Sequence, residues 1–255
     1  MKIEVRGINK SFGRKQALKD VNLVMKPGEI TGFVGANGAG KTTLMRIIMG
    51  VLLSDSGEVI IDGRPATAND RRQIGYMPSE RGLYAKMKVL EQLMFFAEIR
   101  GMKKAAARKQ ALEWMERLNI MEYAGKNLET LSTGNQQRVQ LAVALIAKPR
   151  ALILDEPFSG LDPMAVETMS NVIREQAKSG MPILFSSHQL ELIDQISTEV
   201  AIISRGQIIA TGTPAALRKQ AKVPETIKIP TPLKNIFGDL IAQDEVKQEK
   251  EAQNA

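Results

Sequence analysis

Residues 35–42 read GANGAGKT, and no other segment limits so strongly what this chain can fold into. Apolar residues at positions 30, 33 and 34 precede it, as in a buried strand, and apolar residues at 44, 47, 48 and 51 follow it at the spacing of one helix face. The sequence therefore predicts a strand, a glycine-rich loop and a helix in succession, which is the arrangement of a phosphate-binding P-loop. The alternative is a chance glycine loop, and an accidental match in a chain of this length is about a one-in-a-hundred event at average glycine content.

The residue types in this loop suit a chain of phosphate groups. Backbone N–H groups can surround phosphate oxygens only where no side chain blocks the approach, and Gly35, Gly38 and Gly40 leave that space. Lys41 would place a positive charge between the terminal phosphates, and Thr42 would offer its hydroxyl to Mg²⁺. A helix beginning near Lys41 would direct its positive dipole end at the anion. The loop indicates nucleotide binding, although kinases, GTPases, motors and transporters all share it.

The composition is that of an ordinary water-soluble globular chain. Its 255 residues, 44% of them hydrophobic, suffice for one large domain or for a core with a smaller inserted domain. No apolar stretch approaches the roughly 18 residues of a membrane-spanning helix, and the start MKIEVRG lacks the apolar core of a signal peptide. The absence of cysteine excludes disulfides and thiolate metal sites, and a single histidine argues against a multi-histidine zinc site. We expect a cytosolic chain that reaches a membrane only through a partner.

The charge balance is basic, with a net charge of +7 and a pI near 9.5. Nucleic acid, acidic lipid headgroups, ATP itself or a well-solvated surface would each account for it. The densest basic stretch, RGMKKAAARK at 100–109, is alanine-rich and predicts a solvated helix face. Aromatic residues make up only 4% of the chain, which leaves little material for stacking single-stranded nucleic acid. No nucleic-acid partner is therefore expected.

Strand and helix patterns alternate along most of the chain, which favours an α/β fold. Between about 83 and 146 the strand patterns disappear, and 89–100 and 105–118 have helical patterns. The strand-like segments are 3–5, 30–34, 59–61, 152–154, 183–186 and 200–203. We expect a nucleotide-binding core at 1–78 and 147–222, a helical subdomain at 79–146, and a flexible tail at 223–255 that contains spaced prolines and ends in KQEKEAQNA.

A second motif, ALILDEP at 151–157, suits a buried parallel strand that ends in two acids. Asp155 is placed to hold Mg²⁺, directly or through water, and Glu156 could polarise a water molecule that attacks the γ-phosphate. The alternative is an ordinary pair of carboxylates at the end of a strand. An acidic strand end is, however, what a P-loop enzyme needs for its metal.

A third motif, LSTGNQQ at 131–137, precedes a helical pattern, and Ser132 taken alone is most simply a helix N-cap. With SGLD at 159–162 and FSSH at 185–188, the ordered motifs resemble those of the ATP-binding-cassette (ABC) ATPases over about residues 1–220. The resemblance implies a P-loop NTPase (RecA-like) core with a mostly parallel sheet, N-terminal antiparallel strands and an inserted α-helical subdomain.

The resemblance also implies roles for individual residues. In this family two cassettes meet head to tail, and each ATP lies between the P-loop of one cassette and the LSTG-type segment of the other. Ser132, Gly134 and Asn135 would then act on the partner's nucleotide, and Asp162 would line the seam. The implied nucleotide-binding positions of the chain's own loop are Gly35, Asn37, Gly38, Ala39, Gly40, Lys41, Thr42 and Thr43.

For His188 and Phe12, the role that the resemblance implies has an ordinary structural role as its alternative. His188, the only histidine, matches the family's switch histidine, which contacts the γ-phosphate. A lone histidine at a strand end is nevertheless more often structural than catalytic. Phe12, in KSFG, matches the family's aromatic residue that stacks on adenine. Its alternative is packing in the core, which is the common role of aromatic side chains.

One position departs from the family pattern. The segment IGYMPSERGLY places Ser79 where the family usually carries a glutamine that touches Mg²⁺ and the attacking water. Ser79 could bind the metal through a water molecule, or Glu80 could substitute for it. Thr133 in LSTG, where LSGG is commoner, is a smaller change. The segments PSERGLY and LSTGNQQ together resemble the branch of the family that powers efflux of drugs, antibiotics or sodium.

The implied function is an ATPase subunit at the cytoplasmic face of the membrane, with ATP and Mg²⁺ as cofactors. It would dimerise on ATP with a second copy of itself and drive a separate polytopic membrane subunit. The mixed apolar and charged segment 79–94 would receive a short helix of that subunit, or would simply pack the helical insert on the core. The alternative is a soluble ABC protein acting on nucleic acid, ribosomes or iron–sulfur assembly, but the long heptad insert or second cassette that such proteins carry is missing. A non-ABC P-loop kinase would not explain LSTGNQQ.

Overall fold

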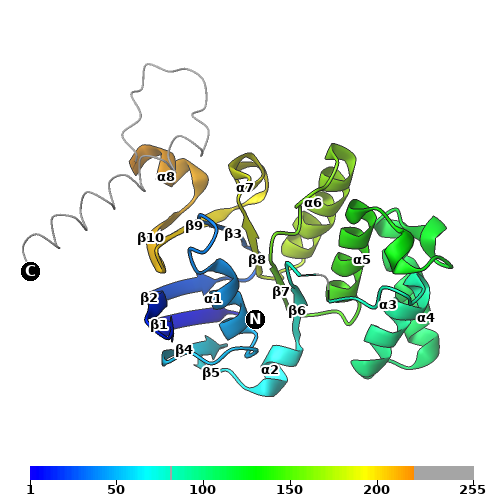
Figure 1. The fold of residues 1–255 in the computed structure, drawn as a ribbon, viewed down its shortest axis with the longest axis horizontal. Helices are drawn as coiled ribbons and strands as arrows, with labels where there is room; N and C mark the ends of the chain where they lie inside the picture. The colour runs from blue at the N-terminus through cyan, green and yellow to red at the C-terminus, as the bar shows by residue number, and fades with distance from the viewer. Residues whose placement is uncertain (81, 221–255) are drawn as a thin grey trace, which may run out of the picture.

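The structure is a computed structural model that describes residues 1–80 and 82–220. Two β-sheets and a set of helices make up this part of the chain (Figure 1). The tail predicted for 223–255 lies outside the described residues. Among those residues, no helix is both long enough and apolar enough to cross a membrane.

The first sheet is antiparallel and begins with a long hairpin of β1 and β2. The two strands pair from Ile3 opposite Met25 to Phe12 opposite Lys15, so Phe12 sits at the hairpin turn. The sequence predicted only the first residues of β1 and missed β2. The strands run in the order β2-β1-β4-β5, and their bounds are Ile3–Phe12 (β1), Lys15–Met25 (β2), Ser56–Ile61 (β4) and Arg64–Pro65 (β5).

The second sheet is parallel except for β10 and runs in the order β10-β9-β3-β8-β7-β6. The carboxyl ends of parallel strands meet at one edge of a sheet, so the segments that follow β3, β7 and β8 lie close together there. The predicted 30–34 strand is confirmed at both ends, whereas β6 and β10 were not predicted. The bounds are Ile30–Val34 (β3), Ile74–Met77 (β6), Ala151–Leu154 (β7), Ile183–Ser187 (β8), Glu199–Ser204 (β9) and Gln207–Gly212 (β10).

The helical region lies to one side of the parallel sheet (Figure 1). Described residues from 83 to 146 contain helices and short 3₁₀ turns but no strand, as predicted. The basic segment 100–109 is mostly exposed, as predicted, with Ala107 buried. The helices are Lys41–Ile48 (α1), Ala68–Arg72 (α2), Val89–Ile99 (α3), Lys104–Arg117 (α4), Thr133–Leu145 (α5), Pro163–Lys178 (α6), Leu190–Ile196 (α7) and Pro214–Gln220 (α8).

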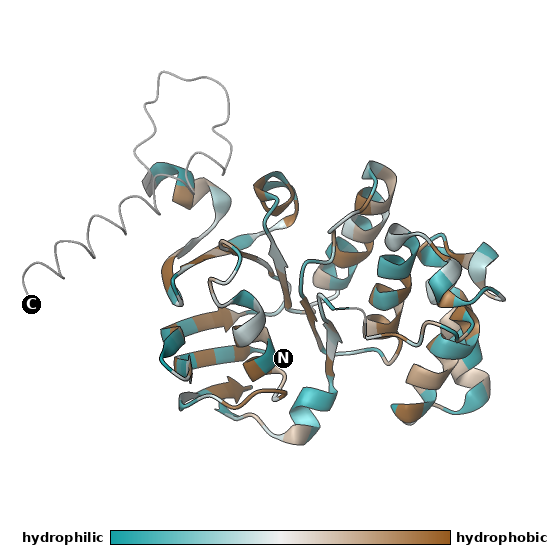
Figure 2. Ribbon diagram, in the orientation of Figure 1, coloured by the Kyte–Doolittle hydropathy of each residue, from teal (hydrophilic) through white to brown (hydrophobic). Residues whose placement is uncertain are grey.

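Two apolar cores lie on the two faces of the parallel sheet. Phe33 and Leu44 belong to the core that joins the antiparallel sheet, α1 and the parallel sheet. Leu154 and Trp114 belong to the other core, which the helical region shares. Figure 2 shows the corresponding apolar strands at the centre of the molecule. The helical region thus packs directly against the strand that leads to Asp155.

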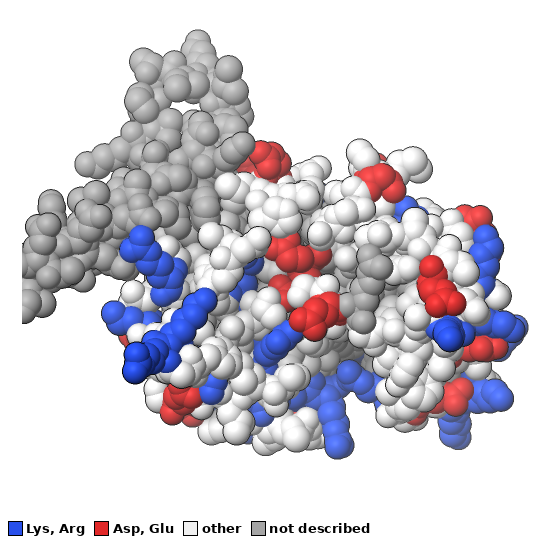
Figure 3. All heavy atoms as spheres, viewed as in Figure 1, with Lys and Arg blue, Asp and Glu red and all other residues white. Residues whose placement is uncertain are grey.

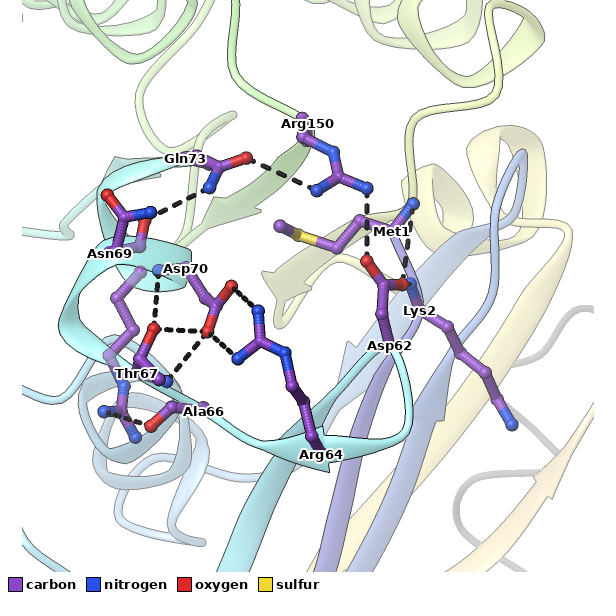
Figure 4. A network of polar contacts seen from close by, with 11 residues as sticks. Met1, Lys2, Asp62, Arg64, Ala66, Thr67, Asn69, Asp70, Gln73 and Arg150 are labelled. Carbon is purple, nitrogen blue, oxygen red and sulfur yellow. Dashed lines mark hydrogen bonds and ion pairs between the residues drawn. The ribbon is translucent and has the colours of Figure 1, made fainter.

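The short helix α2 is fixed by a compact polar network (Figure 4). The Thr67 hydroxyl accepts the N–H of Asp70, and the Asp70 carboxylate accepts the N–H of Thr67 in return. Nη1 and Nη2 of Arg64 each donate to one carboxylate oxygen of Asp70 at 2.8 Å. The guanidinium group of Arg64 lowers the pKa of this carboxyl well below its ordinary value. The network holds the helix that carries Arg71 and Arg72.

Candidate nucleotide-binding site

The glycine-rich loop joins β3 to α1, as the sequence predicted. Gly40 caps α1 with a φ of 112°, and Gly38 has a φ of 81°, both in the region that favours glycine. A Cβ at Gly40 would lie 2.8 Å from the carbonyl oxygen of Ala17, and one at Gly35 would lie 2.5 Å from that of Ile203. Two of the glycines therefore also permit close packing of the loop on the hairpin and on β9.

Lys41 is buried at the first position of α1, and its ammonium group folds back over the loop. Its Nζ donates to the carbonyl oxygens of Gly35 at 2.6 Å and Ala36 at 3.3 Å. Burial lowers the pKa of Lys41, and the nearby carboxylates of Glu156 and Asp155 oppose that shift. The positive charge of Lys41 is thus held between the loop and the two acids, where phosphate oxygens would pair with it and accept hydrogen bonds from the loop's N–H groups.

Asp155 is almost completely buried, and hydroxyl groups hold both of its carboxylate oxygens. Thr42 donates from Oγ1 to Oδ2 at 2.6 Å, and Ser186 donates from Oγ to Oδ1 at 2.6 Å. A hydroxyl and a carboxylate on facing elements form an oxygen donor set that fits Mg²⁺, which takes few protein ligands alongside phosphate and water. The described residues contain no cluster of three acidic, histidine or cysteine side chains that would instead form an all-protein metal cage.

Glu156 follows Asp155 in a left-handed backbone conformation, with a φ of 53°. Such a conformation costs about 1 kcal/mol or more for a residue with a side chain. A hydrogen bond at 2.9 Å from its N–H to Oγ of Ser186 stabilises the turn. Its carboxylate oxygen Oε2 lies 2.9 Å from Nδ1 of His188. The turn therefore directs the second acid toward the histidine and away from the buried Asp155.

Ser186 is a residue of the candidate site that the sequence did not predict. It lies in the FSSH segment at 185–188, where the only signal for a role is its spacing of two residues before His188. Its hydroxyl accepts from Glu156 and donates to Asp155, so one buried side chain fixes both acids. The pairing of β7 with β8 creates this contact.

A cavity of about 470 Å³ brings these elements together. Phe12, at the hairpin turn, is 51% exposed, so the alternative of a core phenylalanine is wrong. Ser79 also lines the cavity, whereas its neighbour Glu80 points to Arg46 and forms an ion pair at 3.3 Å. The lining residues are Phe12, Lys15, Ala17, Asn37, Gly38, Gly40, Lys41, Thr42, Thr43, Ser79, Asp155 and Glu156.

The 131–137 segment lies elsewhere and does not line this cavity in the part of the chain that the structure describes. Ser132 caps α5, and its hydroxyl accepts the N–H of Asn135 at 3.4 Å, as the N-cap interpretation predicted. A Cβ on Gly134 would lie 3.4 Å from Leu161, so this glycine packs on the SGLD segment. Asp162 caps α6 by accepting the N–H of Ala165 at 2.9 Å. Both N-caps stand side by side, apart from the chain's own phosphate loop.

A P-loop at the carboxyl edge of a parallel sheet, with its threonine bonded to an aspartate at the end of β7, defines a P-loop nucleoside triphosphatase. Residues 18–159 match the family model described as ABC transporter. The chain belongs to this family and is the ATP-binding subunit, an ATPase, of an ABC transporter.

The chain is similar in sequence to several ATP-binding proteins of transport and resistance systems. The chain is 43% identical over 205 residues to the uncharacterized ABC transporter ATP-binding protein YhaQ of Bacillus subtilis, covering 80% of this chain and 69% of that protein. It is 33% identical to the linearmycin resistance ATP-binding protein LnrL of the same organism, covering 83% and 69%. It is 34% identical to the lipopolysaccharide export system ATP-binding protein LptB of Escherichia coli, covering 87% and 94%.

Solved structures give the same fold. An ATP-binding subunit of an ABC transporter aligns with a TM-score of 0.84 at 27% identity, covering 94% of this chain and 100% of that one. MJ0796, described as a dimeric bacterial ABC transporter cassette, aligns with a TM-score of 0.77 at 24% identity, covering 83% and 98%. These similarities confirm the predicted ABC cassette fold.

Proposed function

We propose that this subunit hydrolyses ATP with Glu156 as the general base and that hydrolysis drives export through a separate membrane subunit. The observation that carries the catalytic part is the arrangement of Glu156 between Ser186 and His188, beside a buried Asp155 and the P-loop lysine. This arrangement places a partly exposed carboxylate next to the proposed position of the γ-phosphate.

Different residues of the chain would have different roles in the reaction. Lys41 and the loop N–H groups bind the phosphates, and Phe12 provides an exposed ring for the adenine. Thr42 and Asp155 would hold Mg²⁺, and Ser79 would contact it through a water molecule. Mg²⁺ in this position would neutralise charge on the phosphate oxygens.

Glu156 would take the proton from the attacking water. With 20% of its side chain exposed, this carboxylate is accessible to a water molecule from the cavity. His188 orients that carboxylate through Nδ1 and leaves its other ring nitrogen free to approach the γ-phosphate. Asp155, with both oxygens already hydrogen-bonded, is poorly suited to act as a base.

We propose that two copies of the chain assemble head to tail on ATP. The supporting observation is that Ser132, Gly134 and Asn135 stand apart from the chain's own phosphate loop while forming an N-terminal helix end that can bind an anion. Asp162 lies beside this segment and would line the seam. Met164, the second residue of α6, is 76% exposed and would become covered in such a dimer.

A basic groove supports docking of the membrane subunit. A cavity of about 1020 Å³ opens between α2, the end of α3 and residues 147–150, and none of its described lining residues is acidic. Figure 3 shows basic side chains at the lower edge of the molecule, the region where Figure 1 places α2. Its cationic lining residues are Arg71, Arg72, Arg100, Lys148 and Arg150.

Some of these cations already have partners and others are available. Arg150 pairs with Asp62 at 3.1 Å and approaches Gln73, as Figure 4 shows. Arg71 donates to backbone carbonyl groups. Arg72 and Lys148 have no ion-pair partner among the described residues. We therefore propose that the cytoplasmic segment of the membrane subunit that docks here carries carboxylates.

The described residues of segment 79–94 do not line this groove, but the segment leads into α3, whose last residue, Ile99, does. Tyr84 is 52% exposed and packs against Phe95 and Phe96 with ring centroids 5.7 and 6.1 Å apart. Leu83 is partly buried against the core, as the packing alternative predicts for that residue. From segment 79–94, we therefore propose that Tyr84 contacts the short helix of the membrane subunit, together with the basic groove.

The direction of transport rests on the relatives. LnrL is named for linearmycin resistance and LptB for lipopolysaccharide export, and both names support export. Together with the PSERGLY and LSTGNQQ segments, they support the efflux branch for this chain. The transported substrate would bind in the membrane subunit, outside this chain.

The experiment for the partner uses tagged chain purified from detergent-solubilised membranes of cells that express it natively. The double change Arg72→Glu with Lys148→Glu should abolish copurification of a polytopic membrane protein. The matched control is Lys104→Glu with Lys109→Glu on the exposed face of α4. Wild-type chain recovered only with ribosomes or nucleic acid would contradict the transport assignment.

A further inference from the structure

Helix α5 holds two loops through glutamines on one of its faces. Nε2 of Gln136 donates to the carbonyl oxygens of Leu128 at 3.1 Å and Leu131 at 2.9 Å. Nε2 of Gln140 donates to the carbonyl oxygen of Pro78 at 2.9 Å and reaches that of Glu80 at 3.4 Å. The two glutamines are four residues apart, so they lie on the same face of the helix, one turn from each other.

These contacts end directly beside two proposed ATP-site residues. Leu131 precedes Ser132, and Pro78 precedes Ser79, which lines the nucleotide cavity. Gln140 is 4% exposed and does not line that cavity. Because a buried amide is costly to leave unpaired, the bond from Gln140 fixes the loop backbone as well as its own side chain.

The other end of the loop is also attached to the helical region. Gln92 of α3 is fully buried, and its Oε1 accepts the N–H of Tyr84 at 2.6 Å. The N–H of Glu129 donates to the carbonyl oxygen of Ala85 at 2.9 Å. The loop that carries Ser79 is therefore hydrogen-bonded to α3 and α5 on the helical side. On the core side it continues from β6, and the exposed Glu80 pairs with Arg46 of α1 at 3.3 Å.

We propose that Gln140 is a positioning residue that fixes Ser79 to the helix beginning at Ser132. A shift of α5 then moves the metal side of the chain's own ATP site together with the segment that serves the partner's site. Docking at the nearby groove could thereby act on both ATP sites of the dimer through one rigid connection. The inference rests on the roles proposed above for Ser79 and Ser132.

The test compares Gln140→Met with Gln137→Met. Methionine has nearly the length of glutamine and a similar helix propensity but lacks the amide. Gln137 is the matched control because it lies on the same helix, is 8% exposed, and has an Oε1 with no hydrogen-bond partner among the described residues. Both proteins are assayed for Mg²⁺-dependent ATP hydrolysis and for amide hydrogen exchange of residues 78–84.

Gln140→Met should raise the Mg²⁺ concentration for half-maximal hydrolysis about fivefold to tenfold, the scale of one or two lost hydrogen bonds. It should also accelerate exchange in residues 78–84, and Gln137→Met should do neither. A purely structural role would lower stability without moving the Mg²⁺ dependence. Equal Mg²⁺ dependence in the two variants would overturn the proposal.

Gln140→Glu is the second variant, since it keeps the size of the side chain and removes the NH₂ donor. It should reproduce the Mg²⁺ shift, and failure of both Gln140 variants to fold would make this residue structural and overturn the proposal. If the Gln140 variants show normal Mg²⁺ dependence while Glu156→Gln abolishes hydrolysis, the positioning role of Gln140 is wrong and the proposed function stands. Full hydrolysis by Glu156→Gln would instead remove the proposed function.

Discussion

Oε2 of Glu156 lies 2.9 Å from Nδ1 of His188, although 32 positions separate the two residues. The contact exists because β7 and β8 are neighbours, with Leu154 opposite Phe185, so both strands end at the same edge of the sheet. The histidine side chain is 55% exposed and the glutamate side chain 20% exposed. The more exposed imidazole can therefore meet a nucleotide while it orients the proposed base.

His188→Ala should lower the turnover number for ATP by about a hundredfold, because Glu156 loses the group that orients it. ATP affinity should change by less than about threefold, since the phosphate-binding loop remains intact. Steady-state hydrolysis and fluorescent-nucleotide titration measure the two quantities. A turnover number within a few fold of that of the wild type would remove His188 from the mechanism.

Ser186→Ala should lower both stability and turnover. It leaves the buried Oδ1 of Asp155 and the N–H of Glu156 without their partner, at a cost of about 2 kcal/mol in the free energy of unfolding. Ser170→Ala is the control, because Ser170 is equally buried but its hydroxyl has no partner among the described residues. Urea unfolding compares them, and an equal effect of the two changes would contradict the role of Ser186.

Phe12→Ala should weaken ATP binding about tenfold or more, the scale of one lost aromatic stack on a base. Its ring is 51% exposed, so the melting temperature should hardly change. Phe12→Trp should restore binding, and Phe95→Ala, which removes another exposed ring, serves as the control. Unchanged nucleotide affinity in Phe12→Ala would refute the adenine role.

Ser79→Gln should be tolerated, because a longer amide would reach directly the metal that we propose Ser79 contacts through a water molecule. The hydrolysis rate should be maintained or raised, and the Mg²⁺ concentration for half-maximal rate should fall. A titration of Mg²⁺ at saturating ATP measures this. A tenfold loss of rate would show that the short side chain is required. Glu80 is a poor substitute, because Arg46 already binds it on the outside of the molecule.

The sequence predicted best where pattern and chemistry agree locally. The continuous apolar run at 30–34 and the glycine-rich loop placed β3 and the start of α1 correctly. The strand β2 was missed because its open face carries polar residues such as Lys15 and Asn22, which weaken the apolar pattern. The strand β6 was missed because four residues are too few to show a period.

Contacts across the sheet and contacts between a loop and a helix could not be predicted from the sequence. Ser186 meets Asp155 across 31 positions, and Gln140 meets Pro78 across 62. Neither spacing follows from any local pattern, because strand order and helix packing create both contacts. The motifs identified the residue types at the site, and only the fold assigned their partners.

The central claim is that Glu156 is the general base of this ATPase, and ATP hydrolysis by purified Glu156→Gln tests it most directly. The control is Glu58→Gln, an exposed glutamate on the antiparallel sheet. Glu156→Gln should retain ATP binding and form an ATP-dependent dimer on size-exclusion chromatography. Its rate of ATP hydrolysis should fall by about a hundredfold or more. Hydrolysis by Glu156→Gln within a few fold of the wild-type rate would contradict the account.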